Sequence, residues 1–80
     1  MTQTTANVAI NGDELRRRRW LAGETQDSFA ALADISPAYI SHIEAGRRTT
    51  ISPPYFVRIC NALGIPEADR ELMIRNQDAA

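Results

Sequence analysis

The chain has 80 residues, of which 44% are hydrophobic, and a formal net charge of -1 at pH 7. A chain of this length buries only about 60% of the surface that it exposes when unfolded, which argues for one small domain and against a large substrate-enclosing enzyme. Its single cysteine, Cys60, has no partner for an internal disulfide, and its apolar neighbours indicate a buried side chain. No segment is apolar for long enough to cross a bilayer and residues 1–7 carry no secretory signal, so we expect a cytoplasmic protein.

The charges are distributed unevenly along the chain. Between Arg16 and Arg58, seven arginines stand against four acidic residues, a local balance of +3. The rest of the chain has six acidic residues against two arginines, a balance of -4. This asymmetry is compatible with one basic face that binds phosphate and an acidic part held away from it.

The first two predicted helices each begin at a capping residue. Asn11, with Glu14 three residues later, forms a capping-box pattern for a helix that runs to about residue 22 and ends at Gly23. Thr25 caps the second helix, which has an apolar side.

Three further helices follow in the same way. Ser36 and Pro37 are a cap and first-turn pair that opens the third helix, and Gly46 ends it. Ser52, followed by two prolines, repeats this start for the fourth helix, and the acidic stretch after Pro66 begins the fifth. No strand-like alternation is present, and the short connections predict an all-α, compact five-helix bundle.

The second and third predicted helices are separated by a tight turn over residues 33–36, the arrangement of a helix-turn-helix. Ala30 is small enough to let the two helices cross closely, and Asp34 stands where the turn needs a residue that tolerates a left-handed backbone. Ile40 and Ile43 have the spacing of a buried stripe. The outward-facing residues of the third helix are therefore the candidates for contacting DNA: Pro37, Ala38, Tyr39, Ser41 and His42.

The chain resembles the Cro and phage-repressor type of helix-turn-helix domain, the XRE family. The likeness runs from about Gly12 to Leu72 and is carried by LRRRR, TQDSFA, YISHIEAGRR and SPPYFVRICNALGI in register. It implies a lambda-repressor-like fold and a DNA-binding transcriptional regulator, a repressor or Cro-like protein, that binds a palindromic operator on double-stranded DNA as a homodimer. The chain departs from the family pattern at Glu24, at Asp34 and at the first two residues of the third helix.

The resemblance implies phosphate contacts on either side of the third helix. Gln26 would donate to a phosphate, next to main-chain amides presented by the Thr25 cap, with a solvated glutamine as the alternative. Arg47 and Arg48, in the loop after the third helix, would lie along the phosphates, with a solvated turn as the alternative. The predicted DNA-binding residues are Thr25, Gln26, Ser36, Pro37, Ala38, Tyr39, Ser41, His42, Arg47 and Arg48.

Within the third helix, the predicted contacts differ with the side chain. His42 occupies a family position that reads base edges and its imidazole can donate to guanine, the alternative being a merely exposed histidine. Tyr39 would touch a phosphate or a sugar, unless it is a partly buried surface tyrosine. Ser41 would bond to a base or a phosphate, whereas Pro37 and Ala38 would read shape or a thymine methyl group. Few long polar side chains point outward, which predicts a large contribution from DNA shape.

The first helix has a mainly structural interpretation. By the family resemblance, Arg19 turns inward to pair with Glu44 late in the third helix, whereas Arg16 and Arg17 are read as a solvated face. Trp20 and its neighbour are expected to pack in the core or in an interface. A dimer surface is expected to draw on Tyr55, Phe56, Leu72, Met73 and Ile74.

The remaining function classes have little support. One histidine, no cysteine pair and no glycine-rich phosphate loop predict no enzyme activity, no metal, no cofactor and no small-molecule ligand. The alternative function is a helix-turn-helix protein-interaction module, such as an antitoxin or adaptor, because the base readers are few and the net charge is acidic. We divide the chain into a flexible N-terminal segment (1–10), the helix-turn-helix domain (11–76) and a tail (77–80).

Overall fold

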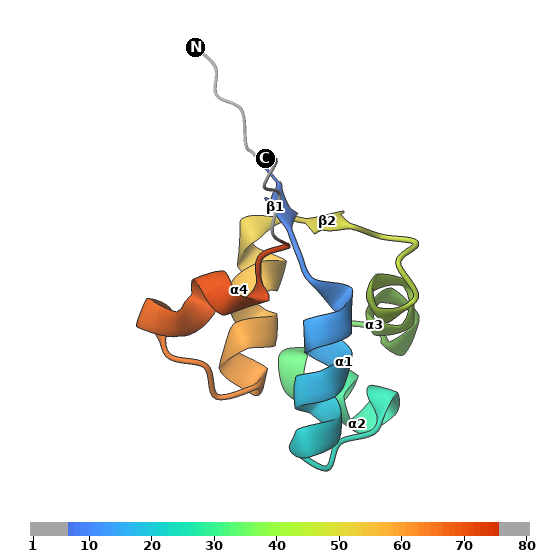
Figure 1. Ribbon diagram of the computed structural model, residues 1–80. Coiled ribbons are helices and arrows are strands. Elements are labelled where there is room, and N and C mark those ends of the chain that lie inside the picture. Colours follow the sequence, from blue (N-terminus) through green and yellow to red (C-terminus); the bar gives the residue numbers. More distant parts are fainter. Residues whose placement is uncertain (1–6, 76–80) are drawn as a thin grey trace.

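Five helices and one short two-stranded sheet make up residues 7–75, the part of the chain that the computed structural model describes (Figure 1). The prediction of a helical fold with a helix-turn-helix in its second and third helices is confirmed. The predicted tail, residues 77–80, and residues 1–6 lie outside the described part. The elements are β1 (Val8–Ala9), α1 (Gly12–Leu21), α2 (Gln26–Ala33), α3 (Pro37–Glu44), β2 (Thr50–Ile51), α4 (Pro53–Ala62) and the 3-10 helix η1 (Glu67–Met73).

The predicted caps form at Asn11, Thr25 and Ser36, although the Glu14 carboxylate accepts from Arg17 and Arg18 and does not complete a capping box. The Asn11 side chain accepts a hydrogen bond from the backbone N–H three residues later, and Ser36 does the same at the start of α3. Thr25 and Ser28 form a reciprocal capping box at the start of α2. Ser52 makes no side-chain capping bond, so α4 begins with its prolines alone.

The turn between α2 and α3 has the predicted left-handed residue. Asp34 has φ 60° and ψ 48°, and Ile35 is buried below it with its N–H bonded to the carbonyl of Ala30 at 3.0 Å. Aspartate adopts this backbone region more readily than most residues, which lets the chain reverse without glycine. The turn is therefore fixed to the end of α2 by backbone bonds, and the buried Ile35 side chain anchors it in the core.

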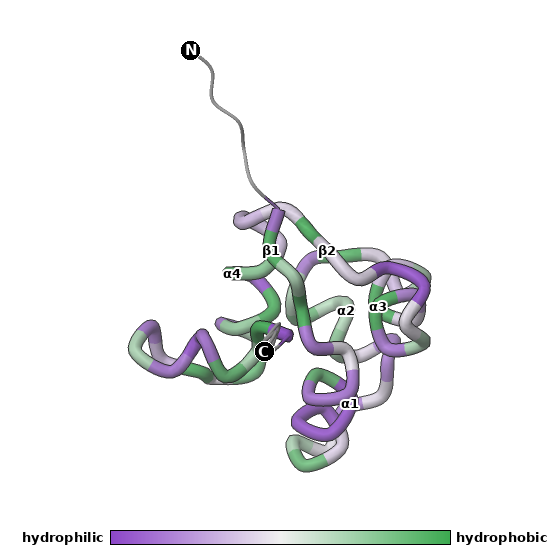
Figure 2. Tube along the Cα trace, turned by 45° about the horizontal axis from the view of Figure 1, so that its top comes forward, coloured by the Kyte–Doolittle hydropathy of each residue, from purple (hydrophilic) through white to green (hydrophobic). Residues whose placement is uncertain are grey.

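A short antiparallel sheet is a minor addition to the predicted helical fold. β1 pairs with β2, with Val8 opposite Ile51, and Ile10 bridges to Ile74 beyond η1. Ile10 is fully buried, so residues 8–10 belong to the fold and the assignment of all residues 1–10 to a flexible segment is wrong for these three. Two-residue strands are too short to show alternation, and their partners lie about forty residues apart in the sequence. Figure 2 shows the two strands side by side next to the start of α1.

Exposure at the end of α1 excludes one of the two expectations for Trp20 and Leu21, packing in the core. Trp20 is 59% exposed and Leu21 is 72% exposed, so neither belongs to the core of this chain. α1 is largely hydrophilic along its length (Figure 2) and contributes Leu15 to the core. The buried hydrophobic residues come from every element except β1 and from three connecting segments: Ile10, Leu15, Phe29, Ala30, Ala33, Ile35, Ile40, Ile43, Ile51, Phe56, Ile59, Cys60, Ile65 and Met73.

Cys60 is fully buried on α4, as the sequence predicts. Burial raises the pKa of its thiol above the ordinary value, because the thiolate would lose its hydration. The thiol is therefore held in its unreactive protonated form. Within residues 7–75, none of the helices is both long and apolar enough to cross a membrane.

Candidate nucleic-acid interface

α3 has one buried side and one exposed side along its whole length. Ile40, Ile43 and Glu44 are buried, and helical geometry places Ala38 and His42 on the opposite side, where both are exposed. Pro37 is also exposed, and Tyr39 and Ser41 flank this side as half-buried residues. The outer side of α3 is therefore available to a partner.

Arg19 and Glu44 are brought together behind this outer side. Arg19 donates from Nε to Glu44 Oε2 at 2.7 Å and from Nη2 to Glu44 Oε1 at 2.8 Å, with side chains only 8% and 4% exposed. The hydrogen bonds to Glu44 raise the pKa of Arg19 against the opposing effect of burial. Arg19 Nη1 also donates to the carbonyl oxygen of Glu24 at 2.8 Å, which ties α1 to the segment before α2.

Gln26 joins the same cluster. Its Nε2 donates to Glu44 Oε1 at 3.1 Å. One amide hydrogen of the residue predicted to bind phosphate is therefore used in a bond within the protein. A glutamine amide has two N–H donors, and the half-buried Gln26 keeps a second one for a ligand. The bond to Glu44 orients that second donor. The sequence alone did not indicate this bond.

Tyr39 packs within the protein on the other flank of α3. Its ring meets that of Tyr55 edge to face, with centroids 5.0 Å apart and an interplanar angle of 68°. The guanidinium of Arg48 lies 4.6 Å from the Tyr39 ring centroid, and that of Arg58 lies 5.2 Å from the Tyr55 centroid. These contacts connect the loop after α3, the start of α3 and α4 in one stack of side chains.

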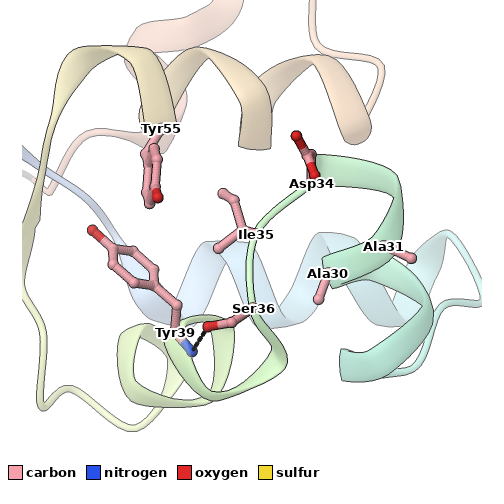
Figure 3. A pocket seen from close by; sticks show the side chains of 7 residues that line it. All are labelled: Ala30, Ala31, Asp34, Ile35, Ser36, Tyr39 and Tyr55. Atoms are coloured by element: carbon pink, nitrogen blue, oxygen red, sulfur yellow. Dashed lines mark hydrogen bonds between the residues drawn. The ribbon is translucent and has the colours of Figure 1, made fainter.

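This stack borders a hollow of about 300 Å³ beside the turn of the helix-turn-helix. Figure 3 shows Tyr39 and Tyr55 side by side across from Asp34, with the side chain of Ile35, a residue of the turn, between them. The Ser36 hydroxyl is used in the cap, accepting from the backbone N–H of Tyr39 at 3.2 Å. Tyr39 is thus oriented by its neighbours, which matches the half-buried tyrosine of the alternative interpretation.

The loop after α3 is fixed to the end of that helix. The backbone N–H groups of Arg47 and Arg48 both donate to the carbonyl oxygen of His42, at 2.9 and 3.1 Å. Both arginine side chains are exposed. Arg48 rests on the Tyr39 ring, whereas Arg47 makes no side-chain hydrogen bond or ion pair within residues 7–75.

A second hollow, of about 260 Å³, lies between α1, the start of α2 and α3. Within it the Arg16 guanidinium lies 4.6 Å from the centroid of the Trp20 ring. Arg16 was expected on a solvated face and Trp20 in a packed contact, so this pair was not predicted. The four-residue spacing of the two on one helix is the signal that identifies it. The lining residues are Arg16, Arg19, Trp20, Gln26, Ser41, Glu44 and Ala45.

The geometry of α2 and α3 agrees with the comparison to known families. A family model described as a helix-turn-helix domain matches residues 12–73. The chain belongs to this helix-turn-helix family. Within residues 7–75, no three His, Cys, Asp or Glu side chains gather in a way that would hold a metal ion.

Solved helix-turn-helix structures superpose well on this member of the family. The restriction-modification controller protein C.AhdI from Aeromonas hydrophila is 27% identical, over 74% of this chain and 88% of its own, with a TM-score of 0.67. The clp gene regulator ClgR from C. glutamicum is 34% identical, over 76% of this chain and 78% of its own, with a TM-score of 0.65. No curated protein matches the chain.

SinR, a master regulator for biofilm formation solved in complex with DNA, shares the fold. It is 20% identical over 74% of this chain and 94% of its own, with a TM-score of 0.68. Together with the family match, these neighbours confirm the resemblance to XRE-type helix-turn-helix regulators.

Proposed function

We propose that the protein is a sequence-specific DNA-binding transcriptional regulator, a repressor or Cro-like protein, that places α3 in the major groove. The observation that carries this proposal is the two-sided character of α3. Its outer side is exposed, and its inner side is held by Ile40, Ile43 and the Arg19–Glu44 pair. A helix fixed in this way enters a groove without first being ordered, so binding loses little conformational entropy. The relatives that resemble the chain are named as regulators, which supports the same assignment.

The outer side of α3 supplies the base contacts in this proposal. His42 donates to guanine N7 or O6, and the small or apolar Pro37 and Ala38 contact thymine methyl groups. A surface with one polar base reader provides modest direct discrimination, so DNA shape carries much of the specificity.

Phosphate contacts flank the helix on both sides. Gln26 uses its second amide hydrogen, and Arg47 and Arg48 place two positive charges at the end of α3. Thr25, Ser36, Tyr39 and Ser41 line the same two edges. Of these, the Thr25 and Ser36 hydroxyls already cap helices, so their contribution is to present the backbone N–H groups of the helix starts.

A homodimer on a palindromic operator extends this model. One α3 reads a short half-site, and a second copy one helical turn away doubles the contact surface. Leu72 and Ile74, 54% and 42% exposed, remain available for the dimer surface, whereas Phe56 and Met73 are buried and are removed from it. In this proposal the dimer acts in the cytoplasm.

Selection of bound duplexes from a random-sequence pool, followed by a salt titration with the selected site, tests the proposal. The logarithm of the association constant should fall linearly with the logarithm of salt concentration, with a slope of about -0.9 per phosphate contacted. The alternative, an antitoxin or adaptor module, is favoured by the net charge of -1 and the short side chains on the outer side of α3. Absence of salt-dependent duplex binding would support that alternative.

A further inference from the structure

We propose that Arg16 and Trp20 of α1 form an additional DNA-backbone contact with Gln26 and Ser41, in the hollow between α1 and α3. This inference rests on the proposed function and extends the interface to a helix that the sequence analysis treated as structural. The bound group is a phosphate of the duplex, held by the Arg16 guanidinium next to the exposed Trp20 ring.

The hollow lies next to the groove-facing side of α3. Ser41 and His42 are consecutive on α3, so the helix turns about 100° from the central base reader to a lining residue of the hollow. Gln26, already a candidate phosphate contact, lines the same hollow from the start of α2. A DNA strand that passes Gln26 therefore also passes Arg16 and Trp20.

The charge of the hollow favours an anion. At its floor Glu44 is neutralised by its two hydrogen bonds from Arg19. Arg17 and Arg18 pair with Glu14, but Arg16 has no carboxylate partner within residues 7–75. Arg16 is therefore the arginine of α1 that makes no ion pair within this part of the chain.

Trp20 positions the guanidinium of Arg16. The Arg16 guanidinium lies over the ring, 4.6 Å from its centroid, so a cation–π contact holds the cation in place. Holding a long side chain in place reduces the entropy lost when it binds a phosphate. The exposed ring also offers an apolar face to the sugar of the same nucleotide.

A pair of matched variants tests this contact. Arg16→Gln and Arg17→Gln remove the same charge from adjacent positions, but only Arg16 lines the hollow. With mixed-sequence duplex DNA, we expect Arg16→Gln to weaken binding and to reduce by about 0.9 the magnitude of the slope of log association constant against log salt concentration. Arg17→Gln should retain the wild-type slope. Equal slopes for both variants and the wild-type protein would overturn the inference.

The fluorescence of Trp20 gives an independent readout, because it is the single tryptophan of the chain. Saturation with the same unlabelled duplex should protect its emission from quenching by acrylamide, and this protection should be lost at high salt. Unchanged quenching at saturation would place Trp20 away from DNA and contradict the proposal. If the wild-type protein binds duplex DNA and the Arg16→Gln variant binds with the same affinity and salt slope, only this contact is refuted. No duplex binding at all by the wild-type protein refutes the proposed function together with it.

Discussion

Glu44 receives both arms of the Arg19 guanidinium, at 2.7 and 2.8 Å, from a helix 25 residues earlier in the chain. The pair is buried directly behind the exposed side of α3 and fixes this helix against α1. Because Gln26 donates to the same carboxylate, a change at Glu44 disturbs three helices together.

Replacing Glu44 with alanine should lower the free energy of unfolding by about 3–5 kcal/mol, because it leaves the Arg19 charge buried without a partner. Urea unfolding followed by circular dichroism measures this loss. The double variant Arg19→Met with Glu44→Leu removes both charges and should recover much of the stability, since buried ion pairs are often replaced by apolar side chains at little cost. A double variant as unstable as Glu44→Ala would show that the pair itself supplies the stability.

Gly12 is required by the close approach of α1 to α3. A Cβ at this position would overlap the backbone carbonyl oxygen of Ile43, an atom that cannot move without shifting α3. We expect Gly12→Ala to cost about 1–3 kcal/mol, as overpacking does in well-packed proteins. The exposed Arg17→Ala on the same helix serves as the control and should change stability by no more than about 0.5 kcal/mol. Equal stability of Gly12→Ala and the wild-type protein would rule out the tight contact.

His42→Ala should relax sequence preference more than it weakens binding overall. Loss of one hydrogen bond to a base costs about 1 kcal/mol, roughly fivefold in affinity, on the selected site. Affinity for random duplex should stay near that of the wild-type protein, since His42 is not assigned a phosphate. Competition between selected and random duplexes measures the ratio of the two affinities. Equal losses of affinity on both duplexes would rule out the base-reading role of His42.

Arg47→Ala should weaken binding to all sequences to a similar extent. Its exposed side chain is assigned a phosphate contact. Its loss should therefore reduce by about 0.9 the magnitude of the slope of log association constant against log salt concentration, without altering the preferred site. Salt titrations on the selected and random duplexes provide the comparison. A changed sequence preference would instead indicate that Arg47 reaches a base.

Several features of the fold follow from local sequence and were predictable for that reason. Thr25, Ser36 and Asn11 cap helices through bonds that span three residues, and these bonds form wherever the segment is helical. Asp34 adopts the left-handed conformation at the turn, a choice governed by its own backbone preferences. The order of helices and the position of the helix-turn-helix depend on such signals and on the spacing of apolar residues.

Other features depend on residues that are distant in sequence. Val8 pairs with Ile51 and the Gln26 amide finds Glu44 only after the helices have packed. The Arg16–Trp20 contact is local, but its place beside Ser41 is set by the angle between α1 and α3. The sequence alone thus determined which helices form and which side of α3 is apolar. The tertiary structure decided which polar groups meet, because those contacts depend on how the helices cross and propensity within each helix does not encode the crossing.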